Sequence, residues 1–277
     1  MTTTVRMERH SIAPHGKQLM TFVAKYPRII HAELWGREQS GMQTGEAIPE
    51  KMQTMANQLW LDGLNALKPY ADKIAAIGET YVRDAAAKGK DHLIERGDEK
   101  IRVHKSLPNR MLEWASYITV IITTTEIENF FRQRRHPDAE IHFQQLAGMM
   151  REAKENSTPT PLEMGQWHLP FVDMNIDRPA ADAWLEANDF SHMGAMDVLR
   201  MVSSARCARV SHLTHDGKRD IAKDIELSER LSIGSGFGHW SPREHIATPA
   251  ADPLQVSGNF IGWLQYRKMF DNENAPG

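Results

Sequence analysis

The chain has 277 residues, of which 41% are hydrophobic and 25% are charged, and its formal net charge is −3. These values are typical of a globular protein with its own core, and they exclude a fibrous or wholly disordered chain. The small net charge leaves no broad basic surface for nucleic acid, although a local arginine cluster is still compatible with binding one phosphorylated small molecule.

The sequence contains a single cysteine, Cys207, so an intrachain disulfide and a cysteine-based zinc site are both excluded. The most apolar stretch, Tyr117 to Ile122, is far shorter than the roughly 20 residues that span a bilayer. The amino terminus carries no apolar signal-peptide core. We therefore expect a cytoplasmic protein.

The N-terminal part of the chain predicts a strand, a long helix and a charged insertion. Apolar residues from Gln18 to Glu33 predict strand, with a bend or a sheet edge at Pro27. From Glu50 onward, apolar residues recur at helical spacing, and Pro69 is expected to kink or divide the helix. The charged segment near 79–102 is typical of a solvated helical insertion or loop.

The C-terminal part predicts one strand followed by several helices. Tyr117 to Thr123 is rich in β-branched residues and predicts a buried strand. Thr125 and Glu128 fit the capping box of a helix that Arg134 closes. Apolar residues at helical spacing predict further helices around Phe143 to Met150, at Ala180 to Ala187, at Met193 to Ala208, and from Ile221 to a stop near Gly234. Few strands among many helices favour an α/β or α+β fold.

Two arginines are candidates for binding a planar or phosphorylated ligand. Arg134 lies beside Arg132 and Arg135 at a helix end, where cations also stabilise the helix dipole. For Arg132 and Arg135 that explanation suffices. For Arg134 a second explanation, ligand binding, stays open, because a planar guanidinium holds a pyrimidine carbonyl or a phosphate through paired donors. Arg110, which follows a Pro-Asn turn, is a candidate of the same type.

A polar cluster of His239, Ser241, Glu244 and His245 follows a glycine-rich turn. Loops carry binding and catalytic residues disproportionately, so the cluster is a candidate site. The alternative is local structure, with Ser241 capping a helix and Glu244 completing the capping box. A zinc site made from two of these histidines is not expected, because the carboxylate or cysteine spacing that accompanies such sites is missing.

Several short motifs together resemble flavin-dependent thymidylate synthases, especially the divergent forms of bacterial viruses. The motifs are Ala208-Arg209-Val210-Ser211-His212, the segment from His239 to His245, Glu128-Asn129-Phe130-Phe131 with Arg134 after it, the segment His136 to Glu140, Trp167-His168-Leu169-Pro170, and Gly258-Asn259-Phe260. Each is short, but jointly they touch most of the chain. Arg243 stands where the family has phenylalanine, and His212 stands where it has tyrosine.

The order of the motifs differs from that of the family. The Ser-Pro-x-Glu-His element precedes the Asn-Phe helix there and follows it here, so the chain resembles a circular permutant. The family's Arg-His-Arg-x-x-Ser loop has no counterpart, and its expected place lies between Glu33 and Leu34. Either the loop has been lost, or it exists in the molecule but not in this sequence. Directly bonded residues would have Cα atoms about 3.8 Å apart.

The resemblance implies a central mixed sheet flanked by helices in a single domain over residues 1–277. It implies reductive methylation of deoxyuridine monophosphate (dUMP), with FAD as cofactor and methylene-tetrahydrofolate and NADPH as co-substrates. By residue match, Arg134 contacts the pyrimidine and stabilises negative charge on its ring, and Arg110 binds the nucleotide. The matched FAD contacts are Asn129, His239, Ser241 and Glu244, and Thr123 and Thr125 occupy a further flavin-contacting stretch with different residue types. Family members are typically homotetramers with shared sites, so an oligomer is expected.

Two alternatives stay open. The first is hydroxymethylation of the same nucleotide for modified viral DNA, which these motifs do not separate from methylation. The second is a catalytically silent flavin- or nucleotide-binding homologue, which the absent loop, Arg243 and His212 favour.

Overall fold

The computed structural model describes residues 3–31, 50–76, 111–113, 116–188, 192–210, 219–233, 239–270 and 273. The chain divides into two compact units, one spanning Pro27–Ile118 and the other Thr2–Tyr26 together with Thr119–Gly277. The single domain over the whole chain stays a prediction. The charged insertion expected near 79–102 lies outside the described residues.

The Pro27–Ile118 unit contains α2 (Glu50–Ala75), a helix of 26 residues. The helix predicted from Glu50 is therefore confirmed. Pro69 lies within α2 and does not divide it. An ion pair between Lys68 and Asp72 lies in the same turn, with 2.8 Å between Nζ and Oδ2.

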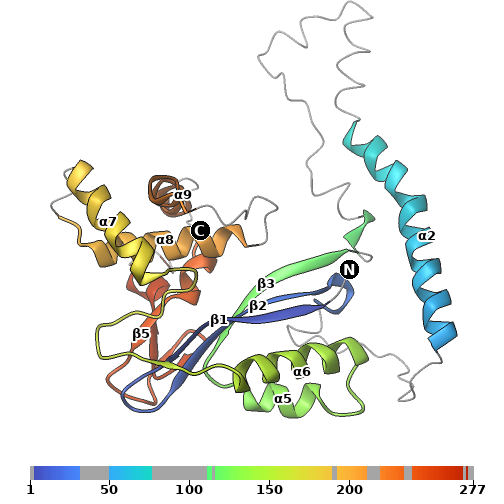
Figure 1. Cartoon of the computed structure of the whole chain (residues 1–277), viewed down its shortest axis with the longest axis horizontal. Helices are drawn as coiled ribbons and strands as arrows, with labels where there is room; N and C mark the ends of the chain where they lie inside the picture. The colour runs from blue at the N-terminus through green and yellow to red at the C-terminus, as the bar shows by residue number, and fades with distance from the viewer. Residues whose placement is uncertain are drawn as a thin grey trace, which may run out of the picture. The chain divides into compact units, whose positions relative to one another are not determined.

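The second unit is built on a four-stranded sheet in the order β3-β2-β1-β4 (Figure 1). Its bounds are β1 (Thr4–Ile12), β2 (Gln18–Pro27), β3 (Tyr117–Thr124) and β4 (Thr160–Pro161). β1 pairs with β2 in antiparallel fashion and with β4 in parallel fashion, so the sheet is mixed. The strand predicted from Gln18 is confirmed as far as Pro27, but Arg28–Ile30 form the 3-10 helix η1, because proline offers no N–H to continue the ladder.

The strand predicted at Tyr117 to Thr123 is confirmed, but its predicted burial was wrong. β3 forms as predicted, but it lies at one end of the strand order, and most of its residues are only half-buried. An edge strand has a neighbour on one side alone, so its β-branched sequence reflects strand propensity more than burial.

The hairpin of β1 and β2 turns tightly at Gly16. Ala13 N donates to Lys17 O and Gly16 N donates to Ala13 O, both at 2.9 Å. Gly16 has φ +85°, a left-handed conformation that glycine adopts without a Cβ clash.

Two helices, α5 (Glu128–Arg134) and α6 (Ile141–Glu155), cover one face of the sheet. α6 packs against β1, and α5 packs against α6. The buried side chains of the two helices are Phe131, Phe143, Leu146, Ala147 and Met150. The last four are the face that the sequence predicted for this helix, and that prediction is confirmed.

The opposite face packs against the C-terminal segments. Leu19 of β2 lies in a buried cluster with Ala247, Phe260 and Trp263, and Val23 packs against a second cluster with Phe171. The helices on this side are α7 (Met174–Asn188), α8 (Ala195–Arg209), α9 (Ile221–Ile233), and the 3-10 helices η4 (Ser241–His245) and η5 (Tyr266–Met269). Short strands accompany them: β5 (Ala247–Pro249), β6 (Val256–Ser257), β7 (Phe260–Ile261) and β8 (Trp263–Gln265).

Both predicted capping boxes were wrong. α5 begins after Ile127, which makes no side-chain cap, and Thr125 Oγ1 accepts instead from Ile261 N at 3.2 Å. Ser241 starts a 3-10 helix after Trp240, again without a side-chain cap. In both places tertiary contacts or a tighter helix replace the expected local hydrogen bonds. The helices predicted near 193–208 and from Ile221 match α8 and α9, whereas α7 begins at Met174, six residues before the predicted start.

The described part of the chain holds six α-helices and the mixed sheet, which confirms the α/β (α+β) class. None of the helices in these ranges is long and apolar enough to cross a bilayer.

The packing of α6 on the sheet gives a stability prediction. Leu146 is fully buried, whereas Ile141 in the first turn of the same helix is 65% exposed. Leu146→Ala should lower the free energy of unfolding by about 2–5 kcal/mol, because it removes apolar contacts and leaves a cavity. Ile141→Ala should change it by less than about 0.5 kcal/mol. Urea unfolding of both variants measures the contrast, and equal effects would contradict the assigned face of α6.

Candidate functional site

The end of β3 carries two buried threonines, Thr123 and Thr125, that the resemblance assigns to flavin contact. Thr123 Oγ1 lies 2.9 Å from His245 Nδ1 and 2.9 Å from Thr21 Oγ1. Thr125 Oγ1 accepts from Ile261 N at 3.2 Å. Both hydroxyls are therefore engaged inside the protein, where they join β3 to the C-terminal segments.

The Thr123 hydroxyl belongs to a longer series of hydrogen bonds. Thr21 Oγ1 lies 2.8 Å from His168 Nε2, and His168 Nδ1 lies 2.8 Å from Ser11 Oγ. We call the series Ser11, His168, Thr21, Thr123 and His245 the hydroxyl–imidazole chain. Its first four members are buried, and His245 is half-buried. It crosses the sheet face that meets the C-terminal half.

Both histidines of this chain are neutral at pH 7. Burial lowers the pKa of His168 well below its ordinary value, and the nearby cationic Arg9 lowers it further. Burial lowers the pKa of His245 to about 4. A neutral imidazole has one N–H and one lone pair, so each ring can donate from one nitrogen and accept at the other.

The Gly258-Asn259-Phe260 segment is fixed beside Thr123. Asn259 Nδ2 donates to Thr123 O at 3.4 Å, and Gln265 Nε2 donates to Asn259 Oδ1 at 2.8 Å. Gly258 has φ +61°, and a Cβ there would lie 2.2 Å from Gln265 Oε1. The conformation thus favours glycine at 258, and a Cβ there would push the Gln265 amide out of its place. Residues of four separate motif or site segments therefore meet near the end of β3.

Arg134 does not join this group within one chain. It lies in the last turn of α5, where its Cζ is 5.5 Å from the centroid of the Phe143 ring. Among the described residues, no hydrogen bond or ion pair connects Arg134 to the hydroxyl–imidazole chain. Arg110 lies outside the described residues, as do Glu33 and Leu34, where the absent family loop is expected.

The residues matched to FAD contacts lie in two places. Asn129 is exposed on α5, and its Oδ1 accepts from Arg132 Nη2 at 2.8 Å. His239, Ser241 and Glu244 precede His245 in or next to η4. His239 and Ser241 are exposed, whereas Glu244 Oε2 is 2.7 Å from Nη1 of Arg267. Ser241 and His239 are thus open to a ligand, and Asn129 and Glu244 already have protein partners.

Arg243, which stands where the resembled family has phenylalanine, is 3% exposed. Its guanidinium lies over two aromatic rings, with Cζ 5.2 Å from the Trp240 centroid and 5.0 Å from the Phe270 centroid. Nη2 donates to Ser228 O at 3.0 Å. The flat guanidinium stacks on these rings, so the replacement keeps η4 packed on the core.

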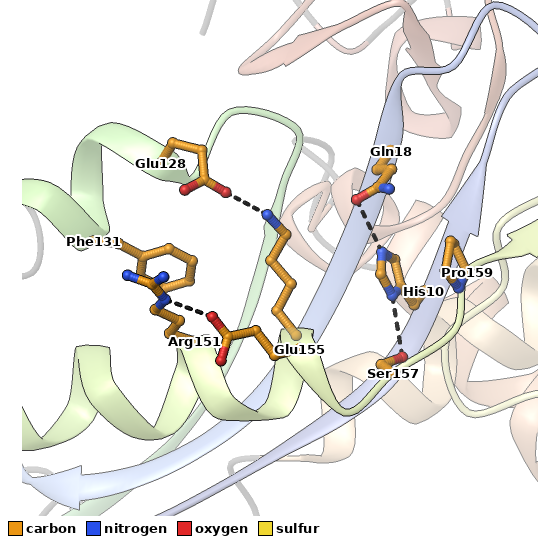
Figure 2. A pocket seen from close by; sticks show the side chains of 9 residues that line it. His10, Gln18, Glu128, Phe131, Arg151, Glu155, Ser157 and Pro159 are labelled. Atoms are coloured by element: carbon orange, nitrogen blue, oxygen red, sulfur yellow. Dashed lines mark hydrogen bonds and ion pairs between the residues drawn. The ribbon is translucent and has the colours of Figure 1, made fainter.

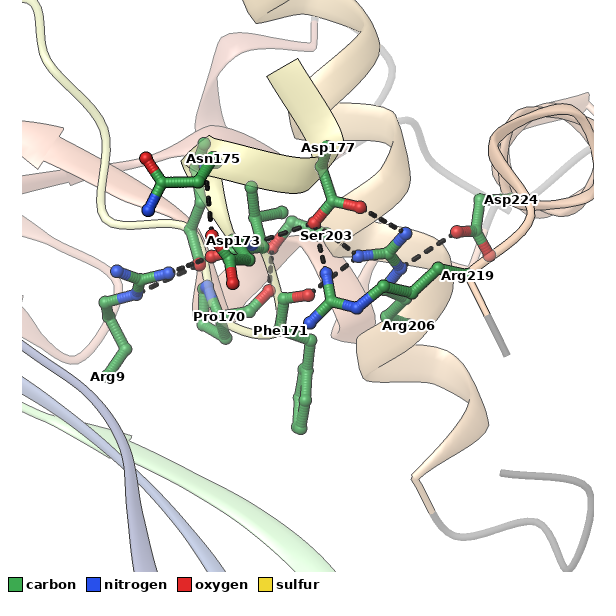
Figure 3. Close-up of polar contacts among 12 residues, drawn as sticks. Arg9, Pro170, Phe171, Asp173, Asn175, Asp177, Ser203, Arg206, Arg219 and Asp224 are labelled. Atoms are coloured by element: carbon green, nitrogen blue, oxygen red, sulfur yellow. Dashed lines mark hydrogen bonds and ion pairs between the residues drawn. The ribbon is translucent and has the colours of Figure 1, made fainter. Parts of the chain in front are cut away.

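The Arg206–Val210 segment has a structural role. Arg206 donates from Nη1 and Nη2 to Asp177 at 2.8 and 3.0 Å, and from Nε to Asp224 at 2.9 Å (Figure 3). Its Nη1 also donates to Phe171 O at 2.8 Å. Two further arginines, Arg209 and Arg219, pair with these carboxylates. This buried ion network joins α7, α8 and α9. Removing one of its members would leave a buried charge without an ion-pair partner.

A separate cavity of about 310 Å³ lies on the α6 side of the hairpin (Figure 2). His10 faces it, with Nδ1 3.1 Å from Ser157 Oγ and Nε2 3.3 Å from Gln18 Oε1. The charged side chains of the lining pair with one another, as Lys154 with Glu128 and Arg151 with Glu155. None of the matched ligand contacts lines it.

Metal ligands do not cluster in the described ranges, where no group of three or more His, Cys, Asp or Glu side chains is suited to an ion. Known proteins give no further guidance: no family model, no curated protein and no solved structure matches the chain. The functional assignment therefore rests on the residues and their arrangement.

Three members of the hydroxyl–imidazole chain were not predicted as site residues. His168 belongs to a Trp-His-Leu-Pro motif of the resemblance, so its signal was present in the sequence. Ser11 and Thr21 carry no such signal, because a single hydroxyl in a strand is common. Their pairing with His168 over more than 140 residues exists only in the fold.

Removing the central hydroxyl tests whether the chain stabilises the fold. Thr21→Val keeps the shape of the side chain but deletes two hydrogen bonds and leaves His168 Nε2 without its partner. The free energy of unfolding should fall by about 1–3 kcal/mol. Thr4→Val, at an exposed position of β1, is the matched control and should change it by less than about 0.5 kcal/mol. Urea unfolding of both variants measures these changes. An unchanged free energy of unfolding in Thr21→Val would contradict a stabilising role of the hydroxyl–imidazole chain.

The lowered histidine pKa values predict a pH dependence of stability. The His245 pKa is about 4 in the folded protein against 6.5 ordinarily, so the unfolded chain takes up the proton first. This contribution is fully present above pH 6.5 and is lost as the pH falls toward 4, and His168 acts in the same direction. His245→Asn removes one titrating ring and keeps a polar atom near the Nδ1 position.

The free energy of unfolding of His245→Asn should therefore fall less steeply with decreasing pH, by up to about 1.4 kcal/mol per pH unit. Urea titrations across this range measure the slope. The control His136→Asn replaces an exposed histidine and should retain the wild-type slope. If His245→Asn also retained it, His245 would not be held neutral by burial.

Proposed function

We propose that this chain is a flavin-dependent thymidylate synthase-like enzyme that reductively methylates dUMP with FAD, methylene-tetrahydrofolate and NADPH. The supporting observation is convergence at the end of β3. Thr123 bonds His245 and Asn259, and through Thr21 it is linked to His168. Short motifs that matched the family by chance would have no physical reason to meet in space.

FAD, when bound and reduced, would supply the hydride for this reaction. In this proposal the η4 side would hold the flavin. His239 and Ser241 are exposed and offer an imidazole and a hydroxyl, and His245 at the end of η4 is held by Thr123. Glu244 is held by Arg267, so it would contact the ligand through its second oxygen or after releasing that pair.

In this proposal Arg134 binds the pyrimidine and stabilises the negative charge that develops on its ring. Arg110 binds the nucleotide. α5, which carries Arg134, packs on α6 at one face of the sheet, whereas η4 packs with α8 and η5 on the side of the other face. A site that uses Arg134 and Glu244 together would therefore draw them from different copies of the chain. That requirement agrees with the homotetramer that the resemblance implies.

A catalytically silent flavin- or nucleotide-binding homologue is the second candidate. The observation that favours it is that Asn129 and Glu244, two of the matched FAD contacts, already have protein partners. Hydroxymethylation of dUMP differs from methylation in the mass of its product. Product mass would therefore separate these two enzyme activities.

Flavin binding and turnover test the proposal directly. The purified protein should show the visible absorption bands of bound FAD, and it should release tritium from dUMP labelled at C5 when folate and NADPH are supplied. Arg134→Ala should lower tritium release by at least about 100-fold, because it removes charge stabilisation at the reacting ring. Arg135→Ala, one residue further at an exposed position, is the matched control and should retain activity.

The outcomes separate the alternatives. Protein that stays colourless with added FAD and releases no tritium would overturn the proposal. Protein that binds FAD without tritium release would favour the silent homologue. Full activity in Arg134→Ala would remove this arginine from the mechanism.

A further inference from the structure

The hydroxyl–imidazole chain can hold its protons in four ways. It contains three hydroxyls with one hydrogen each and two neutral imidazoles with one N–H each. Every bond needs one donor and one acceptor. Five hydrogens serve four bonds, so each arrangement leaves one hydrogen unused, on His245 Nε2 or on the hydroxyl of Thr123, Thr21 or Ser11.

In the first arrangement Ser11 donates to His168 Nδ1. His168 then carries its proton on Nε2 and donates to Thr21, Thr21 donates to Thr123, and Thr123 donates to His245 Nδ1. The proton of His245 is left on Nε2. Every hydrogen of the buried members is used in a bond.

In each of the other three arrangements His245 donates from Nδ1 to Thr123. The hydroxyl hydrogen of Thr123, of Thr21 or, in the fully reversed arrangement, of Ser11 is then left over. All three hydroxyls are buried, and in the described part of the protein they have no side-chain partner outside this chain. A buried donor without an acceptor is costly, so the first arrangement is favoured.

At the other end of the chain, His245 is half-buried, and none of the described residues bonds its Nε2. The favoured arrangement places an N–H on this atom. His245 is the last residue of η4, whose first residue, Ser241, is exposed.

We propose that Ser11 fixes the tautomer of His245 through His168, Thr21 and Thr123, and that His245 Nε2–H donates to an acceptor atom of a bound ligand. Ser11 and His168 are positioning residues, and His245 is the binding residue. The ligand is a neutral or anionic heterocycle with a carbonyl oxygen or ring nitrogen at the recognised edge. That ligand class rests on the proposed function, whereas the tautomer does not.

The tautomer is measured by NMR on the full chain with ¹⁵N-labelled histidine, because protonated and unprotonated ring nitrogens have separate ¹⁵N shifts. Wild-type protein should show His168 and His245 protonated on Nε2. Protonation of His245 on Nδ1 would overturn the proposal.

Breaking the chain tests transmission. Thr21→Val alone should leave His245 protonated on Nε2, because the Thr123 hydroxyl hydrogen still has His245 Nδ1 as its acceptor. Ser11→Asp gives His168 Nδ1 a partner that only accepts hydrogen bonds. Where this variant folds, both histidines should carry their proton on Nδ1. In the double variant Ser11→Asp with Thr21→Val, only His168 should do so. A folded Ser11→Asp protein in which His168 moves its proton to Nδ1 and His245 does not would contradict transmission.

The ligand role is tested with FAD alone. Added FAD should shift the His245 Nε2 signal, and His245→Asn, which lacks an atom at Nε2, should weaken FAD binding at least about tenfold. His142→Asn on α6 is the control and should bind as wild type does. Equal binding by His245→Asn would overturn the ligand role. If the wild type does not bind FAD, the proposed function and ligand class fail, and the NMR result still decides the tautomer.

Discussion

The hydrogen bond between Thr21 and Thr123 is the contact on which the candidate site depends. Strands β2 and β3 bring the two hydroxyls to 2.9 Å from each other, and each hydroxyl carries one further bond to an imidazole. The sheet thereby holds His168 on one side of the pair and His245 on the other. A rigid sheet is a more precise support for a binding group than a loop would be.

A second constraint fixes the segment that carries His168. Phe171 has φ +62°, which is strained for a residue with a side chain. Its backbone is held from both ends, because Arg206 donates to Phe171 O and Phe171 N donates to Glu8 Oε1 at 2.9 Å. The buried ion network of Arg206 thus positions the backbone and takes no part in binding or catalysis. It locks the Trp167–Pro170 segment against the sheet, so His168 reaches Thr21.

The sequence predicted the parts of the fold that depend on local pattern. The apolar face of α6, the helix from Glu50 and the strand from Gln18 were all visible in residue spacing. The capping boxes failed because Thr125 satisfies the backbone of Ile261, which is 136 residues away. Strand β1 was not predicted, and its pairing with β2 depends on a hairpin turn at Gly16.

For the candidate site, residue spacing and the resemblance identified some of the residues but not the contacts between them. Thr123 and the His239–His245 segment were identified, yet the direct contact to Thr123 is made by His245 and not by His239, Ser241 or Glu244. Ser11 and Thr21 were missed because a hydroxyl in a strand signals nothing until the fold places an imidazole beside it. Arg209 belongs to a motif of the resemblance, and its ion pair with the buried Asp224 gives it a structural role.

The central claim is that the five side chains from Ser11 to His245 behave as one unit. A double-mutant cycle between Thr21→Val and His245→Asn tests it most directly, because these residues do not bond each other and communicate only through Thr123. Urea unfolding of the wild type, both single variants and the double variant gives the coupling. The account predicts a coupling free energy above about 0.5 kcal/mol, whereas additivity within about 0.3 kcal/mol would contradict it.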